Sequence, residues 1–354
     1  MKDDAPMWAA DALQGFAIRL FSAAGMDSAM ATTVAELLVE ADLLGHDTHG
    51  LALAPRYLEE LANGSMTTHG AAETLHDTGA CVTWDGRRLP GIWLVSQALD
   101  LALDRAPTHG CVTVVIRNSH HIGCLAAYLA RAAERGCVMI LACSDPSQAS
   151  VAPFGGTQAV FTPNPMAMGF PTGGDPVLID TSASITTNNM AARLAREGRR
   201  YTSPVLLSAD GEVSDDPSVL KAGGTLLPAG GLDHGQKGYG WALMVEALTQ
   251  GLSGFGRADR PSGWGASVFL QILDPAAFGG QPAFVRQTEA LAQRCRANTP
   301  RPGVDRVRLP GQAGLMRKRL AEQRGLALCP AVMNGLEAWA GKLHVLLPKP
   351  LSGT

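Results

Sequence analysis

The segment Gly45–Gly50 (GHDTHG) holds the densest group of residues able to move a proton. It contains His49, and histidine is the side chain best suited to proton transfer near neutral pH because its ordinary pKa is about 6.5. The hydroxyl of Thr48 can fix the tautomer of the neighbouring imidazole. We therefore expect His49 to be an acid–base group that titrates near neutrality, with Thr48 as its partner. A turn that ends a helix, with Asp47 and Thr48 satisfying backbone donors, explains the same residues equally well.

A second pair of histidines, His120 and His121, lies in the segment NSHHIG at 118–123, where a predicted strand passes into a predicted helix. α/β proteins commonly place ligand-binding groups at such junctions. Together with His46 and His49 these side chains suggest a metal site, and hence a metal-dependent hydrolase as an alternative function. No further cluster of Asp, Glu or Cys has the spacing of metal ligands, so we expect no metal site.

Two polar segments are suited to binding an anionic cofactor. Lys237 precedes the most strongly predicted helix, and a lysine with free backbone amides at a helix start can hold a phosphate or a carboxylate. The segment DTSAS at 180–184 follows a short strand and offers a carboxylate and hydroxyls to a ribose. Neither GxGxxG after a strand nor GxxxxGK[ST] occurs, so a Rossmann dehydrogenase and a P-loop enzyme are both disfavoured.

Hydrophobic spacing predicts the elements that carry these segments. Expected helices cover 9–24, 28–44, 55–62, 93–105, 123–135, 188–197, 238–253, 284–297, 316–324 and 331–341, and expected strands cover 81–84, 112–117, 137–143, 177–180 and 268–273. Residues 145–176, rich in Gly, Pro, Ser and Thr, are expected to form loops and short edge pieces. The helix over 238–253 is expected to bury Trp241, Leu243, Met244 and Leu252.

Length and composition limit the fold and the function classes. A chain of 354 residues can form two lobes, and helices at both ends of a strand-rich middle predict a helical lobe from 1–75 and 290–354 around an α/β lobe at 76–289. A net charge of −3 gives no reason to expect nucleic-acid binding, and no apolar run approaches the ~20 residues of a membrane span. The N-terminus lacks a signal-peptide pattern, which predicts a cytoplasmic protein. The seven cysteines form no CxxC pair and are expected to be free thiols.

In order and wording, the polar segments together resemble one enzyme family. They read GHDTHG at 45–50 with PRYLEEL at 55–61, SHHIG at 119–123, SDP at 144–146 with APFGG at 152–156, TPNPMAMGFPTG at 162–173, LIDTSAS at 178–184, KGYGWALMVEALTQGLSG at 237–254 and RLPG at 308–311. The chain is similar to the malate/L-lactate/sulfolactate dehydrogenases, which include ureidoglycolate dehydrogenase, diketogulonate reductase and piperideine-2-carboxylate reductase. Its GHDTHG segment looks most like the hydroxycarboxylate dehydrogenase branch.

The resemblance implies an α/β (α+β) fold with a mostly antiparallel cofactor sheet, a homodimer, and NAD or NADP as cofactor. It implies hydride transfer between that cofactor and a small 2-hydroxy or 2-oxo acid, with His49 as proton donor, Thr48 as its partner and His121 as a second catalytic residue. A reductase of cyclic or N-alkyl 2-imino acids is the nearest alternative, and a cofactor-binding protein without turnover is another. Cofactor contacts map to Ser144, Asp180, Thr181, Ser182, Lys237, Gly238, Arg308, Pro310 and Gly311.

Two positions depart from the family pattern. The arginine that many members carry three residues after the GHDTHG-type glycine is Leu53 here, and a substrate-contacting threonine is Pro163. Because an arginine–carboxylate pair is a strong directional contact, its loss leaves the substrate open and shifts carboxylate binding, we expect, to Arg56.

Overall fold

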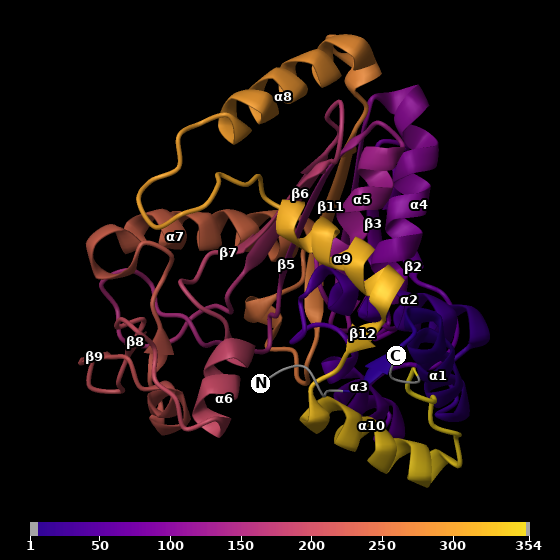
Figure 1. The fold of residues 1–354 in the computed structure, drawn as a ribbon, viewed down its shortest axis with the longest axis vertical. Helices are drawn as coiled ribbons and strands as arrows, with labels where there is room; N and C mark the ends of the chain where they lie inside the picture. Colours follow the sequence, from indigo (N-terminus) through magenta and orange to yellow (C-terminus); the bar gives the residue numbers. More distant parts are fainter. Residues whose placement is uncertain (1–5, 352–354) are drawn as a thin grey trace.

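A seven-stranded sheet forms the centre of the molecule in this computed structural model, which describes residues 6–351 (Figure 1). The strands, in spatial order, are β2 (Glu73–Asp77), β3 (Cys81–Asp85), β4 (Cys111–Ser119), β11 (Ala266–Leu273), β5 (Val138–Ser144), β6 (Pro165–Phe170) and β7 (Val177–Ser182). Only the β3–β4 pair is parallel, and the other pairs are antiparallel. The mostly antiparallel, non-Rossmann sheet is thus confirmed.

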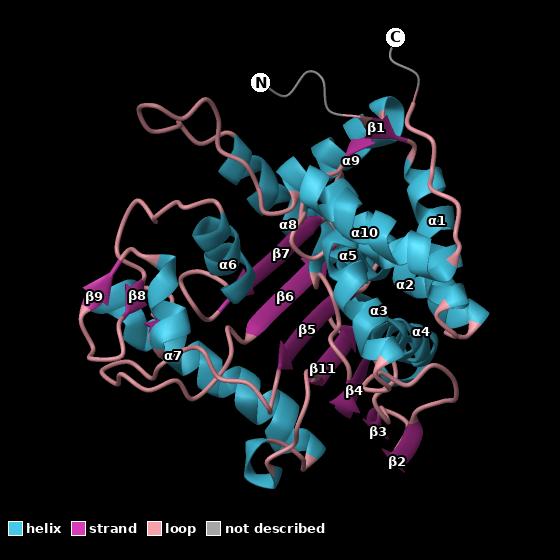
Figure 2. Cartoon of the chain, turned by 90° about the horizontal axis from the view of Figure 1, so that it is seen from below, coloured by secondary structure: helices cyan, strands magenta, loops and turns pink. Residues whose placement is uncertain are grey.

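Alternating side chains of the central strands are buried on both faces of this sheet. Val114, Leu141 and Leu270 join the large core beneath α4 (Gly91–His109) and α5 (Ala126–Glu134). On the opposite face, Val115 and Phe269 pack with Val245 of α7 (Gly231–Glu246). Apolar residues at period two in strands covered by helices on both faces give this arrangement. Figure 2 shows α5 and α7 on either side of the strands.

Helices from both ends of the chain pack together at one side of the sheet. They are α1 (Ala10–Ala23), α2 (Ser28–Leu44), α3 (Ala54–Ala62), α9 (Gln312–Arg324) and α10 (Pro330–Leu343). A short pair, β1 (Met7–Trp8) and β12 (Leu326–Ala327), joins the two ends of the chain. The buried core runs without a break from these helices into the sheet, so the lobe boundaries at 75/76 and 289/290 stay a prediction.

A small second sheet, absent from the sequence-based prediction, lies between α6 (Asn188–Arg196) and α7. Its strands β8 (Leu206–Leu207), β9 (Val213–Ser214) and β10 (Thr225–Leu226) pair in the order β10-β8-β9. Strands of two residues carry too little periodicity to be recognised. β6 was also missed: it lies inside the main sheet, within the segment expected to form loops and edge pieces, and Pro165 is tolerated because it is the first residue of the strand.

The helix expected over 238–253 differs from its prediction in two respects. α7 begins earlier and runs over Gly231–Glu246 with a kink at His234, then continues as a π-helical turn over Ala247–Gly251. Leu243, Met244 and Leu252, which were expected to be buried, are 48%, 56% and 57% exposed. The buried positions include Ala242, Val245 and Thr249 instead, so the apolar face of this helix is wider than the face that the sheet covers.

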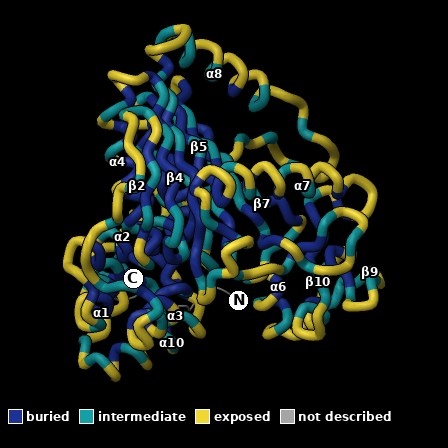
Figure 3. The backbone as a smooth tube through the Cα atoms, turned by 180° about the vertical axis from the view of Figure 1, so that it is seen from behind, coloured by how far each residue is buried: buried dark blue, intermediate teal, exposed yellow. Residues whose placement is uncertain are grey.

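The remaining helix, α8 (Gln281–Arg296), projects from the body of the chain, and only Ala292 along it is buried (Figures 1 and 3). All seven cysteines are free, as expected. Among the described residues, no helix is long and apolar enough to cross a membrane.

Candidate active site

Most of the predicted polar segments meet at one end of the main sheet. Ser119, the last residue of β4, lies opposite Ala266, the first residue of β11, and Ser144, the last of β5, lies opposite Ser267. Pro165 at the start of β6 pairs with Ser182 at the end of β7. Because antiparallel strands alternate in direction, the segments that follow β4, β5 and β7 lie at the same end of the sheet as those that precede β6 and β11.

The loop that carries His49 follows α2 and is hydrogen-bonded to the buried carboxyl group of Asp42 in that helix. Gly45 ends α2 at φ 84°, a conformation that favours glycine. Asp42 accepts a hydrogen bond from the backbone N–H of Leu51 at 2.8 Å. A Cβ on Gly50 would lie 2.2 Å from Asp42 Cγ, so this close approach requires glycine. Burial raises the pKa of Asp42 to about 7. Asp42 was not among the predicted site residues, although an acidic residue on the apolar face of a helix is a signal in the sequence.

His49 is neutral at pH 7 in this structure. Its Nδ1 lies 3.0 Å from Thr48 Oγ1, so Thr48 is the partner that was predicted. Burial, with a smaller contribution from the neighbouring His46, lowers the pKa of His49 to about 4. The expectation that this group titrates near neutrality is therefore wrong, because desolvation disfavours the imidazolium.

His121 faces His49 and has a fixed tautomer. The two imidazole rings are stacked with centroids 6.2 Å apart. The Nδ1 of His121 lies 2.8 Å from the hydroxyl of Tyr57 and accepts a hydrogen bond from Gly123 N at 3.3 Å. Burial raises the pKa of Tyr57 and lowers that of His121, so the phenol donates and the neutral imidazole accepts. The proton of His121 therefore sits on Nε2.

His120 has a different partner, since its Nε2 lies 3.2 Å from Glu60 Oε2. The four histidines therefore do not form one ligand cluster. Among the described residues, the group with metal-ligand geometry is His46, Cys124 and Asp180.

Trp264, just before β11, packs against His120 and His121. Its indole stacks on His121 with centroids 4.4 Å apart, and the guanidinium carbon of Arg56 lies 3.5 Å above its ring centroid. A guanidinium this close to the ring leaves no room for an imidazole on the same face. The indole therefore separates Arg56 from His121, and Arg56 itself is exposed. Trp264 was not predicted as a site residue, because it lies in none of the sequence motifs.

Asp180 and its neighbours lie at the end of β7, close to the His49 loop. One carboxylate oxygen of Asp180, Oδ2, accepts a hydrogen bond from Ala126 N, the first residue of α5, at 2.9 Å. Burial raises the pKa of Asp180, and the charge of His46 opposes that shift. Thr181 pairs with Met166 in the sheet, and the hydroxyl of Ser182 donates to the carbonyl of Ser184 at 2.8 Å.

Ser144, Pro163 and Gly238 have packing roles in this structure. The Ser144 hydroxyl is buried and lies 2.8 Å from Thr249 Oγ1 in the π-helical turn. The carbonyl of Pro163 accepts from Ala183 N at 2.8 Å. A Cβ on Gly238 would lie 2.5 Å from the Ala183 carbonyl oxygen, so glycine lets α7 contact the end of β7.

Lys237 lies on α7 in the first turn after the kink at His234, so the expected helix start is a kink within a longer helix. It is exposed and borders a depression of about 590 Å³ whose other lining residues are Met166, Gln236, Gly240, Trp241 and Met244. The RLPG loop lies at the other end of β7: Pro310 accepts from Leu178 N at 3.3 Å, Gly311 has φ 84°, and Arg308 is exposed.

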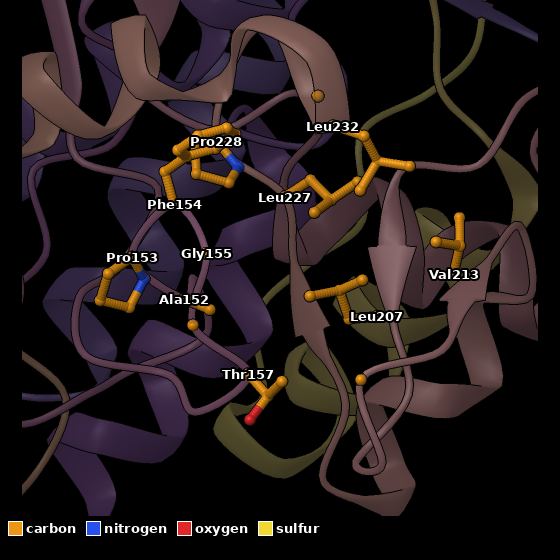
Figure 4. A pocket seen from close by; sticks show the side chains of 13 residues that line it. Ala152, Pro153, Phe154, Gly155, Thr157, Leu207, Val213, Leu227, Pro228 and Leu232 are labelled. Carbon is orange, nitrogen blue, oxygen red and sulfur yellow. The ribbon is translucent and has the colours of Figure 1, made fainter.

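An apolar pocket of about 280 Å³ lies beside the start of α7 (Figure 4). Its walls include Phe154, Leu207, Leu227 and Leu232, and no charged side chain lines it. It can accept a flat apolar group but offers no acid–base residue.

This chain is similar in sequence and in structure to proteins of known family. The family model described as malate/L-lactate dehydrogenase matches residues 8–337. An L-lactate dehydrogenase of Cupriavidus necator is 33% identical, over 90% of this chain and 93% of its own. Hydroxycarboxylate dehydrogenase B of Escherichia coli is 30% identical, over 90% of this chain and 89% of its own. The structure of a piperideine-2-carboxylate reductase from Pseudomonas syringae superposes with a TM-score of 0.83 at 27% identity, over 94% of this chain and 99% of the other.

Proposed function

We propose that this chain, which belongs to the malate/L-lactate dehydrogenase family, interconverts a 2-hydroxy acid and its 2-oxo acid with NAD or NADP. The observation that carries the proposal is the partly buried pair His49 and His121, whose rings stack 6.2 Å apart at the end of the sheet where most of the family motifs converge. When bound, the nicotinamide accepts or supplies the hydride, and the protein provides orientation and proton transfer.

Lys237, the Asp180–Ser182 segment and the exposed Arg308 are the residues that we propose to hold the cofactor. Lys237 is an exposed cation that makes no ion pair among the described residues, and it borders an open depression. A free cation there suits a phosphate. Ser144, Gly238, Pro310 and Gly311 would shape this region through packing, since their contacts in the structure are with the protein itself.

His49 is the proposed acid–base group. Its neutral imidazole can take the hydroxyl proton of a 2-hydroxy acid as hydride leaves the neighbouring carbon, and it returns that proton in the reverse direction. His121 keeps its Nε2–H free, because Nδ1 is occupied by Tyr57 and Gly123. We propose that this N–H donates to the substrate oxygen on which charge develops.

Arg56 is the proposed site for an acidic group of the substrate. Leu53 is buried and cannot replace the missing arginine. Because Trp264 lies between Arg56 and His121, an acid group held by Arg56 is distant from the reacting carbon. We therefore propose that Arg56 binds the distal carboxylate of a dicarboxylic substrate. Arg56→Gln should lower kcat/KM for malate but leave that for lactate unchanged, and equal effects on both acids would refute this role.

A substrate panel with both cofactors tests the activity itself. We expect reduction of at least one 2-oxo acid and oxidation of its hydroxy acid. The panel includes cyclic 2-imino acids, because a relative of known structure reduces one. Turnover of imino acids alone would replace the hydroxy-acid assignment. Cofactor binding without turnover of any member would indicate a binding protein.

We also propose a homodimer that covers the apolar surface left open on this chain. Leu243 and Met244 on α7 are 48% and 56% exposed, and Leu291 on the projecting α8 is 61% exposed. Exposed apolar patches commonly mark subunit interfaces, and the neighbouring Leu243 and Met244 are our candidate for one. Light scattering should give twice the chain mass, and Leu243→Asp should shift it toward the monomer. A wild-type monomer at micromolar concentration would refute the dimer. The cytoplasmic location also stays a prediction, which cell fractionation tests.

A further inference from the structure

Three side chains able to bind a metal ion meet beside the catalytic loop. His46 lies in that loop, Cys124 precedes α5, and Asp180 is on β7, so three separate elements contribute. One ligand atom of each residue lies within 4.8 Å of the other two, and Cys124 Sγ is 3.9 Å from Asp180 Oδ2. Tetrahedral zinc separates its ligand atoms by roughly 3.3–3.6 Å, so small side-chain rotations complete the geometry.

The donor set selects a class of ion. An imidazole, a thiolate and a carboxylate together suit a borderline-soft divalent cation such as Zn²⁺, whereas Mg²⁺ and Ca²⁺ take oxygen ligands. The carboxylate is already oriented, because Ala126 N donates to Asp180 Oδ2 at 2.9 Å. Such a hydrogen bond from outside the ligand set is typical of protein metal sites.

The surroundings allow an ion to enter. Cys124 is 5% exposed, but His46 and Asp180 are partly exposed and provide the approach. Burial and the charge of Asp180 raise the pKa of Cys124, so the thiol is protonated without metal. A bound divalent cation displaces that proton to solvent, because a coordinating thiol is deprotonated outright.

We propose that His46, Cys124 and Asp180 form a binding site for one zinc-class cation that takes no part in catalysis. The four-histidine site considered from the sequence is a different set, and of its members only His46 belongs here. An ion bound here engages Asp180 and restrains the loop three residues before His49. It should therefore inhibit the enzyme, and this consequence rests on the proposed roles of Asp180 and His49.

The test is a titration of the full-length protein with Co²⁺ and with Zn²⁺, followed by spectroscopy and calorimetry. Co²⁺ bound to a thiolate gives a near-ultraviolet charge-transfer band, which reports the cysteine directly and needs no activity. Cys124→Ser and His46→Asn are the test variants, and Cys329→Ser, which changes an exposed cysteine elsewhere, is the matched control. Near-ultraviolet circular dichroism checks that each variant is folded.

We expect one ion per chain, a charge-transfer band in the wild type and in Cys329→Ser, and no band in Cys124→Ser. His46→Asn should weaken Zn²⁺ binding at least about tenfold, as loss of one of three ligands requires. A wild-type protein without the band, or a band that persists in Cys124→Ser, overturns the site. The expected Co²⁺ band and binding of one Zn²⁺, but without inhibition by zinc in activity assays, support the site and count against the proposed roles of Asp180 and His49.

Discussion

Replacing Tyr57 with phenylalanine removes one buried hydroxyl group and leaves the ring in place. That hydroxyl lies 2.8 Å from Nδ1 of His121, and the other donor to this nitrogen, Gly123 N, is at 3.3 Å. Without the phenol, the His121 proton can move to Nδ1, which leaves Nε2 without a proton to donate. A neutral hydrogen bond is worth about 0.5–1.5 kcal/mol net, so the ratio of the competent tautomer to the other should fall about 2- to 13-fold.

Steady-state kinetics in both directions measures this effect. We expect kcat to fall by up to about that factor in Tyr57→Phe while the cofactor Kd stays near wild type. Tyr128→Phe is the matched control, because Tyr128 is equally buried but donates its hydroxyl to the carbonyl of Ile122 at 2.6 Å. Both variants should lose similar stability. A wild-type kcat in Tyr57→Phe, or an equal loss in Tyr128→Phe, would show that the hydroxyl only supports the fold.

Three further substitutions test the remaining roles. His49→Asn should lower kcat by about 10²- to 10⁴-fold with cofactor binding intact, and a loss below about tenfold in steady-state assays would exclude it as the acid–base group. Lys237→Ala should raise the cofactor Kd about tenfold or more in calorimetry, because a charge-assisted contact is worth about 1.5–3 kcal/mol, whereas Lys221→Ala should not. Burial raises the folded-state pKa of Asp42 from 3.8 to about 7, so its stabilising protonated form is lost as the pH rises through that range. Asp42→Asn should therefore raise Tm relative to wild type more at pH 8 than at pH 5, and equal shifts at both pH values would contradict this.

Local signals in the sequence predicted most of the elements. Helix α2 has the expected bounds, 28–44, because Asp27 accepts from Ala29 N at 2.9 Å at its start and Gly45 adopts φ 84° at its end. α5 is shorter at its start than expected, because its first residue, Ala126, is hydrogen-bonded to Asp180 on β7, a contact between distant segments. Hydrophobic periodicity indicates which face of a helix is apolar but not which surface covers that face. This is why Leu243, which is exposed in this chain, was expected to be buried.

The motifs likewise predicted which segments form the site but not how their side chains pair. His49 and His121 are 72 residues apart in the sequence and meet only because β4 ends beside the loop after α2. Trp264 belongs to no motif, yet its indole ring stacks against both His121 and Arg56. The sequence also could not show that Trp264 separates Arg56 from the reacting centre. Because of this separation, Arg56 is suited to a distal carboxylate of the substrate and not to the one next to the reacting carbon.

The charge state of His49 has the largest consequence for mechanism, and pH profiles can test it. With a pKa of about 4 in the free enzyme, His49 is already the required base at pH 6–8, so kcat/KM for oxidation should be flat there. Reduction needs the protonated form, and its kcat/KM should fall about tenfold per pH unit over the same range. A histidine titrating near 7 would instead give an oxidation profile that rises until neutrality.

Asp42 can imitate that result, because its own pKa is about 7 and it anchors Leu51, two residues after His49. Asp42→Asn separates the two groups. If the wild-type oxidation profile rises below pH 7 and the rise disappears in Asp42→Asn, the titrating group is the carboxylate under the loop. If the rise persists in that variant and is lost in His49→Asn, then bound cofactor or a second subunit shields His49 differently from this single chain, and the neutral-base assignment is wrong.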